Sequence, residues 1–547
     1  MRRPSPAWRP RLLVLLPLAF GLPAAPATWQ DDIGFTQLRS LLGPAMPIGA
    51  GVSATHVEAV ASANGEYLPS AITNPTSGNF SLKTFAFQSG ISGISGHAIR
   101  VGSFFYGTNT DAALGDASVA PAIGLAPDDQ VDVYQADDWL DDAFLRPSLS
   151  DVPATENNPV GNHSWISYPS DTSTPAGLND LLRRLDFAAE RDDHLPIAGV
   201  NNGAGTAMPY LLVSGYNGIA IGLTNGAHSS GSSPADLDGP GRVKPELVAP
   251  LDRTSWATGV VSSCAGLLIS EAMATPALAN ATRAETVKAI LLAAATKEEF
   301  PGWANTSTRP LDAHFGAGQV NVLRSHRVLV AGEVNSSNSE LRPSTGWDYS
   351  DPLAPGSRKN YTFTIPAGCR AVEFSAVLTW HRQITGVVGS LLVAPAPELA
   401  NLDLALYQSN NFVAGAQVGV SESGASDSPA HNVEHIYLGH LGAGQFTLRV
   451  TNAAADSFNT DYALAWLTSL GPADKPQLAS TLANDGMVMT LSLSRLCPSL
   501  TYALEKSPDL ASWTRVEIFT AAAESRVLSQ QVAPGTQRLF HRLRWIE

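Results

Sequence analysis

The amino-acid sequence predicts an α/β domain with a parallel sheet flanked by helices, followed by two smaller all-β sandwich domains. Three observations support this fold class. Short apolar runs alternate with segments of helical periodicity over the first 330 residues, as in a parallel sheet that is covered by helices. After the polar linker 335–339, apolar and polar residues alternate in short runs, which is typical of strands. The same alternation begins again after Gly471-Pro472.

The first 27 residues are predicted to be a signal peptide. Arginines precede the apolar run 12–20, and Ala25-Pro26-Ala27 provides small residues for cleavage. We therefore expect a Sec-type exported bacterial protein, secreted or extracytoplasmic, with its α/β domain at 28–335 and its β domains at 340–470 and 473–547. No separate prodomain is visible after the signal, so the α/β domain is expected to fold unaided or with help from the β domains.

Composition and charge argue against nucleic acid or a membrane as the main partner of this protein. The 547-residue chain has a net charge of −15 and offers no basic face that could replace counterions on nucleic acid or an anionic membrane. After the signal, no apolar stretch is long enough to span a bilayer. Cys264, Cys369 and Cys497 fall in three predicted domains without metal-ligand spacing, so neither a disulfide framework nor a metal site is expected. Cys264 is expected to pack as a small buried residue, and the protein is expected to be a monomer.

Four blocks carry the candidate chemistry, and each lies at the end of a predicted strand or the start of a predicted helix. They are residues 49–58, 96–102, 197–203 and 254–259. A parallel sheet brings such positions together at its carboxyl edge. A serine hydroxyl becomes a nucleophile there only when a positioned base takes its proton, and the base needs an orienting carboxylate. Ser255, His97 and Glu58 are the candidates for these roles.

These blocks resemble those of the subtilisin-like serine peptidases (subtilases), over roughly residues 30–335. The resemblance implies that Ser255 is the nucleophile, His97 the base and Glu58 the acid, in place of the family's Asp. The chain order of acid, base and nucleophile is that of subtilisin. The resemblance further implies that Asn201 donates to the oxyanion and that the strand end with Ser164 and Trp165 pairs with an extended peptide substrate.

Simpler interpretations of the same residues stay open. Thr254-Ser255 is also a common helix N-cap, and Asn202-Gly203 is a common tight turn. Glu58 also fits a solvated carboxylate at a strand end. A shift of register by one residue would give Asn202, rather than Asn201, the oxyanion role.

Other patterns concern the helices and the β domains. Leucines at helical spacing predict a helix over 178–185, and Thr282 with Glu285 predicts a capping box at the start of another. The first β domain resembles the bacterial pre-peptidase C-terminal domain, on residues 401–404, 432–436 and 462–466. Asp403 and Asp461 in its loops are either ligands of a structural calcium ion or solvated carboxylates.

Two functional classes follow. The first is a secreted serine endopeptidase that hydrolyses polypeptides and requires no cofactor. The alternative is a weak or inactive protein of the same fold that acts as a surface or binding protein through its β domains. Glu58, together with Arg253 and Gly259 in place of a glycine and a proline of the family's serine block, keeps this alternative open.

Overall fold

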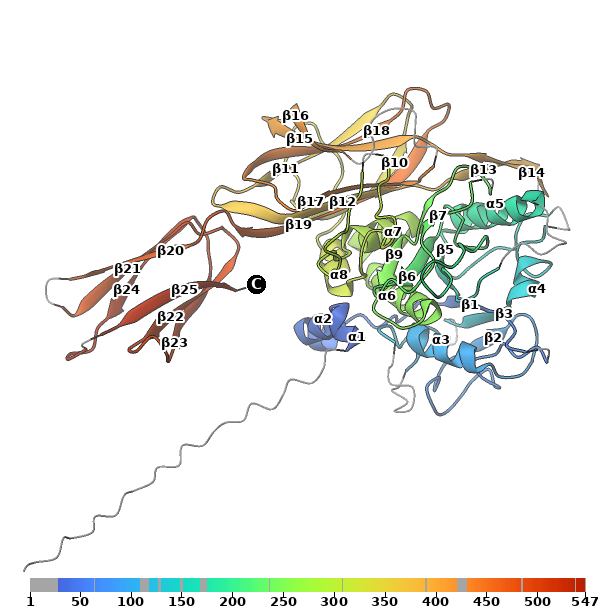
Figure 1. The fold of residues 1–547 in the computed structure, drawn as a ribbon, viewed down its shortest axis with the longest axis horizontal. Helices are drawn as coiled ribbons and strands as arrows, with labels where there is room; N and C mark the ends of the chain where they lie inside the picture. The colour runs from blue at the N-terminus through green and yellow to red at the C-terminus, as the bar shows by residue number, and fades with distance from the viewer. Residues whose placement is uncertain are drawn as a thin grey trace, which may run out of the picture.

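The structure, a computed structural model, describes residues 28–546 except 63, 109–117, 126–128, 148–150, 168–174, 236, 307, 389–390, 421–429, 484–485 and 537. The predicted signal peptide lies outside the described residues. Three bodies follow one another along the chain (Figure 1). An α/β body is covered on one side by a first β domain, and a second β domain extends from the first.

The α/β body is built on a seven-stranded sheet in the order β2-β3-β1-β4-β5-β6-β9, and all its strand pairs are parallel. The strands are β1 (Ala54–Glu58), β2 (Phe85–Phe87), β3 (Val131–Gln135), β4 (Val160–His163), β5 (Leu195–Gly199), β6 (Ile219–Leu223) and β9 (Leu247–Ala249). A separate short pair joins β7 (Gly231–Ser232) to β8 (Val243–Lys244). The predicted parallel α/β sheet is therefore present.

Helices cover both faces of this sheet. They are α1 (Trp29–Asp32), α2 (Phe35–Leu42), α3 (Gly96–Tyr106), α4 (Ala136–Leu140), α5 (Pro175–Asp192), α6 (Thr254–Ala274), α7 (Ala284–Ala293) and α8 (Val322–Val330), with 3₁₀ turns η1 (Gly43–Ala45) and η2 (Pro276–Thr282). Successive strand residues point to opposite faces. Ile197 accordingly belongs to the core beneath α6, whereas Ala198 belongs to the core beneath α5.

Two helix predictions have different outcomes. The leucine pattern over 178–185 is confirmed, because it lies within α5 and buries Leu182 and Leu185. The predicted capping box is wrong. Thr282 ends η2 and its hydroxyl donates to the carbonyl of Ala279, while Arg283 is the N-cap of α7 without a side-chain bond. Glu285 instead contacts the buried His381 of the first β domain.

Helix α6 is long and apolar enough to cross a membrane by length and composition alone. However, 83% of its apolar segment is buried inside the fold, where the helix packs against α3 and several strands of the sheet. It is the central helix of the α/β body.

The first β domain is a sandwich of two four-stranded antiparallel sheets, in the orders β10-β19-β12-β17 and β11-β18-β15-β16. Its strands are β10 (Gly346–Leu353), β11 (Arg358–Ile365), β12 (Cys369–Thr379), β15 (Leu402–Asn410), β16 (Val413–Val420), β17 (Val433–Leu438), β18 (Gly444–Asn452) and β19 (Thr460–Pro472). A hairpin of β13 (Gln383–Val388) and β14 (Leu391–Glu398) reaches from this domain to α5. Side chains of both sheets form the core between them.

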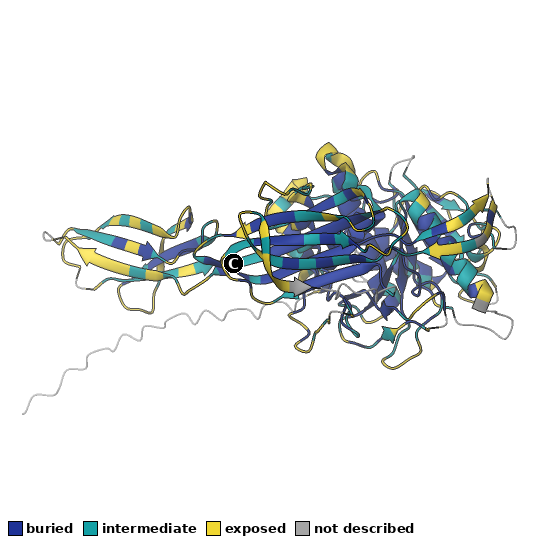
Figure 2. Cartoon of the chain, turned by 90° about the horizontal axis from the view of Figure 1, so that it is seen from above, coloured by how far each residue is buried: buried dark blue, intermediate teal, exposed yellow. Residues whose placement is uncertain are grey.

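The α/β body and the first β domain share one hydrophobic core. Helix α7 packs against β12 and β19, and Trp347, Val377 and Ala465 of the β domain belong to the same buried cluster as the sheet strands and α6. At the edge of this interface, the buried Arg382 guanidinium lies 2.5 Å from Asp186 and 2.6 Å from Asp238. Figure 2 shows buried residues continuing from one body into the other. Because the interface is apolar and continuous, the two bodies form a single packing unit.

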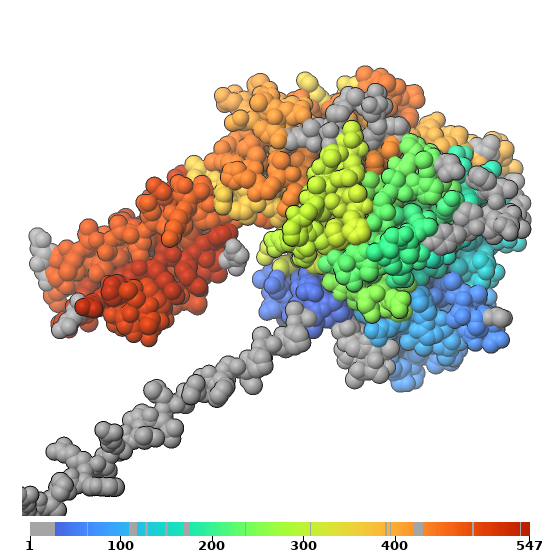
Figure 3. Space-filling view, viewed as in Figure 1, coloured from blue at the N-terminus to red at the C-terminus, as the bar shows by residue number. Residues whose placement is uncertain are grey.

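The second β domain consists of two three-stranded antiparallel sheets, β20-β21-β24 and β23-β22-β25. Its strands are β20 (Gln477–Leu482), β21 (Val488–Ser494), β22 (Thr501–Ser507), β23 (Thr514–Thr520), β24 (Ser525–Gln531) and β25 (Phe540–Ile546). It has a small core of its own and forms a separate lobe (Figure 3). Figure 2 shows that its residues are more exposed than those of the other bodies.

A disulfide joins the two β domains, and this corrects the expectation that the cysteines form no disulfide. Cys369 at the start of β12 is bonded to Cys497, 128 residues later, while Cys264 is a free, buried thiol as expected. The spacing of cysteines along a chain cannot reveal a pair that only the contact between two domains brings together. Disulfides persist mainly in oxidising compartments outside the cytosol.

Candidate active site

The strand order of the sheet places the candidate residues at one edge. Counting outward from β1, the chain adds β3 and β2 on one side and β4, β5, β6 and β9 on the other, so the order reverses between β1 and β4. Ligands of open α/β sheets bind beyond the carboxyl ends of the strands at such a switch point. Glu58 is the last residue of β1, and Ser164 directly follows β4.

Glu58 and His97 are in direct contact. Nδ1 of His97 lies 2.5 Å from Oε1 of Glu58, whose side chain is only 2% exposed. His97 is held in the first turn of α3, where the N-cap Ser95 accepts a hydrogen bond from the N–H of Ala98, and its ring is 36% exposed. Burial by itself would raise the pKa of Glu58, but hydrogen bonds from His56 and His97 hold it below its ordinary value. The alternative of a solvated Glu58 is therefore wrong.

Ser255 lies in the first turn of α6. The N–H of Thr254 donates to Oδ1 of Asn202 at 2.9 Å, and within the described part of the chain the N–H of Ser255 has no acceptor. Free N–H groups and the helix dipole favour negative charge at this position. The Ser255 hydroxyl donates to the carbonyl oxygen of Ser164 at 3.3 Å.

His97 packs against the residue that follows Ser255. Its ring centroid is 5.2 Å from that of Trp256, the residue after Ser255, whereas no hydrogen bond joins His97 to the Ser255 hydroxyl among the described residues. The hydroxyl must turn away from Ser164 before it can give its proton to the imidazole. Catalytic hydrogen bonds are often incomplete without substrate and tighten in the complex.

The turn after β5 connects to α6 through Asn202. The main chain of the predicted oxyanion donor, Asn201, pairs with Ser229 by two hydrogen bonds of 3.0 and 2.9 Å. The side chain of Asn202, by contrast, reaches the first N–H of the helix that carries Ser255. Asn202, the alternative candidate for the oxyanion role, therefore lies at the start of α6.

The predicted substrate strand end is anchored to the serine block. The hydroxyl of Ser164 lies 2.8 Å from Oδ1 of Asn162 and 3.0 Å from the carbonyl oxygen of Ser255. Trp165 is 7% exposed and its indole packs in the core beneath α5, so only its main chain is available to a substrate. Ile166, the next residue, is 39% exposed.

Arg253 and Gly259, which stand where the serine block of the subtilases has a glycine and a proline, are compatible with the local geometry. Arg253 is the N-cap of α6 with φ −139° and ψ 139°, an extended conformation that any residue adopts without strain. Gly259 lies where α6 crosses α3, and a Cβ atom there would stand 3.0 Å from the carbonyl oxygen of Val101. Glycine at 259 therefore permits the close approach of the helices that carry His97 and Ser255.

Two residues near Glu58 were missed by the sequence reasoning. His56 is fully buried, with Nε2 3.3 Å from Oε2 of Glu58 and Nδ1 2.9 Å from the hydroxyl of Tyr106. The available signal was the spacing of His56 and Glu58, since residues i and i+2 of a strand share a face. Nothing in the sequence indicated that Tyr106, at the far end of α3, would meet them.

Within the described ranges, no group of three or more His, Cys, Asp or Glu side chains is arranged to hold a metal ion. The Asp461 carboxylate accepts a hydrogen bond from the hydroxyl of Tyr349 at 2.5 Å, and burial raises the pKa of Asp403 to about 6. Structural calcium at these two carboxylates stays a prediction.

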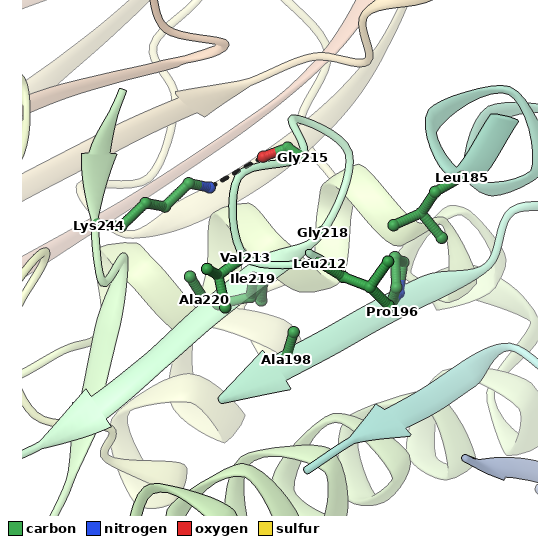
Figure 4. Close-up of a pocket in the computed structure, with 10 residues that line it drawn as sticks. All are labelled: Leu185, Pro196, Ala198, Leu212, Val213, Gly215, Gly218, Ile219, Ala220 and Lys244. Atoms are coloured by element: carbon green, nitrogen blue, oxygen red, sulfur yellow. Dashed lines mark hydrogen bonds between the residues drawn. The ribbon is translucent and has the colours of Figure 1, made fainter. Parts of the chain in front are cut away.

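A small cavity lies beneath β5 and β6 (Figure 4). Its volume is about 10 Å³, which is room for about one water molecule. Its only charged lining group, the ammonium of Lys244, donates to the carbonyl oxygen of Gly215. None of its lining residues is a candidate catalytic residue. They are Leu185, Pro196, Ala198, Leu212, Val213, Gly215, Gly218, Ile219, Ala220 and Lys244.

Comparison with known proteins finds no matching family model and no matching curated protein. Among solved structures, the chain is similar to fervidolysin from Fervidobacterium pennivorans, a keratinolytic enzyme related to subtilisin. The similarity has a TM-score of 0.34 and 9% identity, over 94% of this chain and 71% of that one. It is also similar to the S41 psychrophilic protease, with a TM-score of 0.28 and 14% identity over 50% of this chain and 92% of that one. A β-1,2-glucanase from Parabacteroides distasonis matches at a TM-score of 0.13 and 10% identity, over 39% of this chain and 34% of that one. These scores are low, so the proposal below rests on the geometry of the site.

Proposed function

We propose that this chain is a secreted serine endopeptidase in which Ser255 is the nucleophile, His97 the general base and Glu58 the carboxylate that orients it. The observation that carries the proposal is the 2.5 Å contact between Glu58 and His97, with the imidazole packed against the neighbour of a helix-terminal serine. The carboxylate fixes the Nδ1–H tautomer of His97 and leaves Nε2 free to accept a proton.

The reaction has two halves. The Ser255 hydroxyl attacks the substrate carbonyl carbon while Nε2 of His97 takes its proton, and the carbonyl electrons form an oxyanion. When the tetrahedral intermediate collapses, the C–N bond breaks and the amine leaves with the proton from His97. Water then attacks the acyl-serine with the help of the same base, which releases the acid product and restores the hydroxyl.

The oxyanion would be stabilised at the N-terminus of α6. The N–H of Ser255, which has no acceptor among the described residues, supplies one donor, and a side-chain amide of the turn after β5 supplies the other. Asn201 is the predicted donor, and the contact between Asn202 and Thr254 makes Asn202 a second candidate. Replacing the true donor by Ala is expected to lower kcat by about 100- to 1000-fold, so Asn201→Ala and Asn202→Ala, compared side by side, identify it.

The proposed substrates are polypeptides in an extracytoplasmic compartment. The main chain of 164–166 would pair with an extended peptide, because backbone bonding makes little demand on sequence. The Cys369–Cys497 disulfide supports export to an oxidising environment.

A second candidate function rests on one observation. The Ser255 hydroxyl is bonded to the carbonyl of Ser164 and not to His97. A chain locked in this arrangement would lack turnover and would act as a binding protein through its β domains. The two candidates differ in whether the serine can be activated.

The decisive experiment is labelling of the folded, mature protein by a fluorophosphonate probe, alongside Ser255→Ala and His97→Ala. We expect labelling of the wild type only, since the probe needs an activated serine. Thr258→Ser, a matched hydroxyl change in the same helix, should label like the wild type. If the wild type stays unlabelled while circular dichroism reports a folded protein, the peptidase proposal fails and the binding function takes its place.

A further inference from the structure

The carboxylate of Glu58 contacts a second histidine on the side away from His97. Oε1 accepts from His97, while Oε2 lies 3.3 Å from Nε2 of His56. The other ring nitrogen of His56, Nδ1, lies 2.9 Å from the hydroxyl of Tyr106. His56 and Tyr106 are fully buried and Glu58 is 2% exposed, so these groups have little access to water as an alternative partner.

One arrangement of protons gives each of these nitrogen and oxygen atoms a hydrogen-bond partner while Glu58 alone carries a charge. An ionised Glu58 can only accept, so Nδ1–H of His97 and Nε2–H of His56 both donate to it. His56 is then the neutral Nε2–H tautomer, and its Nδ1 accepts from the O–H of Tyr106. Tyr106 remains a phenol, because burial raises its pKa well above the ordinary value. Each donor in the chain from Tyr106 through His56 points toward the carboxylate.

Such a second anchor addresses a specific difficulty of Glu58. A glutamate has one more rotatable bond than an aspartate, so a contact to one oxygen leaves the carboxylate free to swing away from its histidine. We propose that His56, supported by Tyr106, is a positioning residue that holds the Glu58 carboxylate against His97. This inference rests on the proposed peptidase function, because it assigns His56 a role in keeping the catalytic base oriented.

Helix α3 is built to accommodate this chain of contacts. Side chains of a helix lean back toward its N-terminus, and Tyr106 leans over residue 102, one turn earlier. A Cβ atom at Gly102 would stand 2.7 Å from the Tyr106 hydroxyl oxygen, so only glycine leaves the phenol its position. The same helix therefore carries His97 at its start and the support of His56 at its end.

The titratable groups that face His56 are few. Besides Glu58 and Tyr106, the buried His163 interacts with it electrostatically, and burial holds the pKa of His163 well below its ordinary value, so that ring is neutral. The ammonium of Lys83 lies 5.8 Å from the centre of the Tyr106 ring. Burial lowers the pKa of Lys83 to about 7.

Two amide substitutions, each of which replaces one ring nitrogen of His56, separate positioning from packing. The amide nitrogen of glutamine lies near the position of histidine Nε2, and that of asparagine near Nδ1. His56→Gln thus keeps a donor to Glu58, whereas His56→Asn withdraws it and can keep a partner for Tyr106. The readouts are the titration of His97, followed by NMR of protein with isotope-labelled histidine, and the separate values of kcat and KM.

We expect His97 to titrate at lower pH in His56→Asn than in the wild type, because a displaced carboxylate stabilises the imidazolium less. A misplacement of about 1 Å costs on the order of 100-fold in rate, so kcat should fall by about that factor while KM stays unchanged. His56→Gln should stay closer to the wild type than His56→Asn does, because it keeps the donor to Glu58 although it loses the bond to Tyr106. An unchanged titration in His56→Asn, or an equal shift in both folded variants, overturns the proposal.

Tyr106→Phe covers the case in which His56→Asn does not fold. It removes only the hydroxyl behind His56 and should lower the titration of His97 in the same direction, whereas an unchanged titration overturns the proposal. The titration does not depend on activity. If His97 responds as expected but the wild type is not labelled by the fluorophosphonate, the positioning by His56 stands and the peptidase function fails.

Discussion

Glu285 and His381 form a buried contact where α7 of the α/β body meets the first β domain. Oε1 of Glu285 and Nδ1 of His381 are 3.2 Å apart, although they are not aligned as a hydrogen bond, and both side chains are at most 5% exposed. Burial, together with the charge of Asp461, raises the pKa of Glu285 to about 8, and burial lowers the pKa of His381 to about 4. At neutral pH both groups are therefore uncharged in the folded protein.

Replacing Glu285 by Gln should stabilise the protein in a pH-dependent way. In the unfolded chain the carboxyl ionises with an ordinary pKa of 4.5, so folding at neutral pH must protonate it. The stability that the acid contributes is complete below its unfolded pKa and is lost as the pH rises toward about 8. The neutral amide avoids this loss and should raise the free energy of unfolding by about 3 kcal/mol at pH 7, and by almost nothing at about pH 4.

The assay is urea denaturation of wild type and variant across this pH range. Trp139 is buried in the α/β body and Trp347 in the first β domain, so tryptophan fluorescence reports the unfolding of the unit that these two bodies form. The matched control is Glu298→Gln, which makes the same chemical change at an exposed residue. If wild type and Glu285→Gln differ by the same free energy at acidic and neutral pH, the buried acid does not titrate as argued and the reasoning is refuted.

Three further predictions concern the packing of the three bodies. Gly259→Ala should lower the free energy of unfolding by about 1–3 kcal/mol and reduce peptidase activity, because the new methyl group meets the carbonyl of Val101 and separates α6 from α3. Melting temperature and kcat, measured together, test this. Unchanged values would show that the crossing has room for the methyl group. The isolated fragment 28–335 should not refold to a native circular dichroism spectrum, since α7 and the shared core would lose the first β domain that covers them. A cooperative thermal melt of the fragment would contradict this. Cys369→Ser should lower the free energy of unfolding of the second β domain by about 2–5 kcal/mol and leave fluorophosphonate labelling unchanged. Limited proteolysis of that domain measures the change in stability. Equal protease resistance of variant and wild type would refute the prediction.

Local periodicity predicted helices of the α/β body, whereas most of its strand blocks were predicted from their resemblance to those of the subtilases. The leucines of α5 follow a helical spacing, which determines the face that this helix buries, whereas β1 and β4 are buried at every position and show no i+2 alternation. The change from helical to alternating texture likewise predicted the antiparallel β domains. The sequence also singled out Glu58 and His97, which the fold brings into contact, while the roles of Ser255 and Asn201 stay predictions until the labelling and kinetic tests are made.

What only the tertiary structure decided involves partners far apart in the chain. His56 meets Tyr106 across 50 residues, Asn202 meets Thr254 across 52, and Cys369 meets Cys497 across 128. Glu285 matched a local capping pattern, yet it turns to a histidine of another domain. Periodicity and spacing along a sequence report only on neighbours within a strand or a helix, whereas the order of strands in the sheet and the docking of domains decide which distant side chains share a buried site.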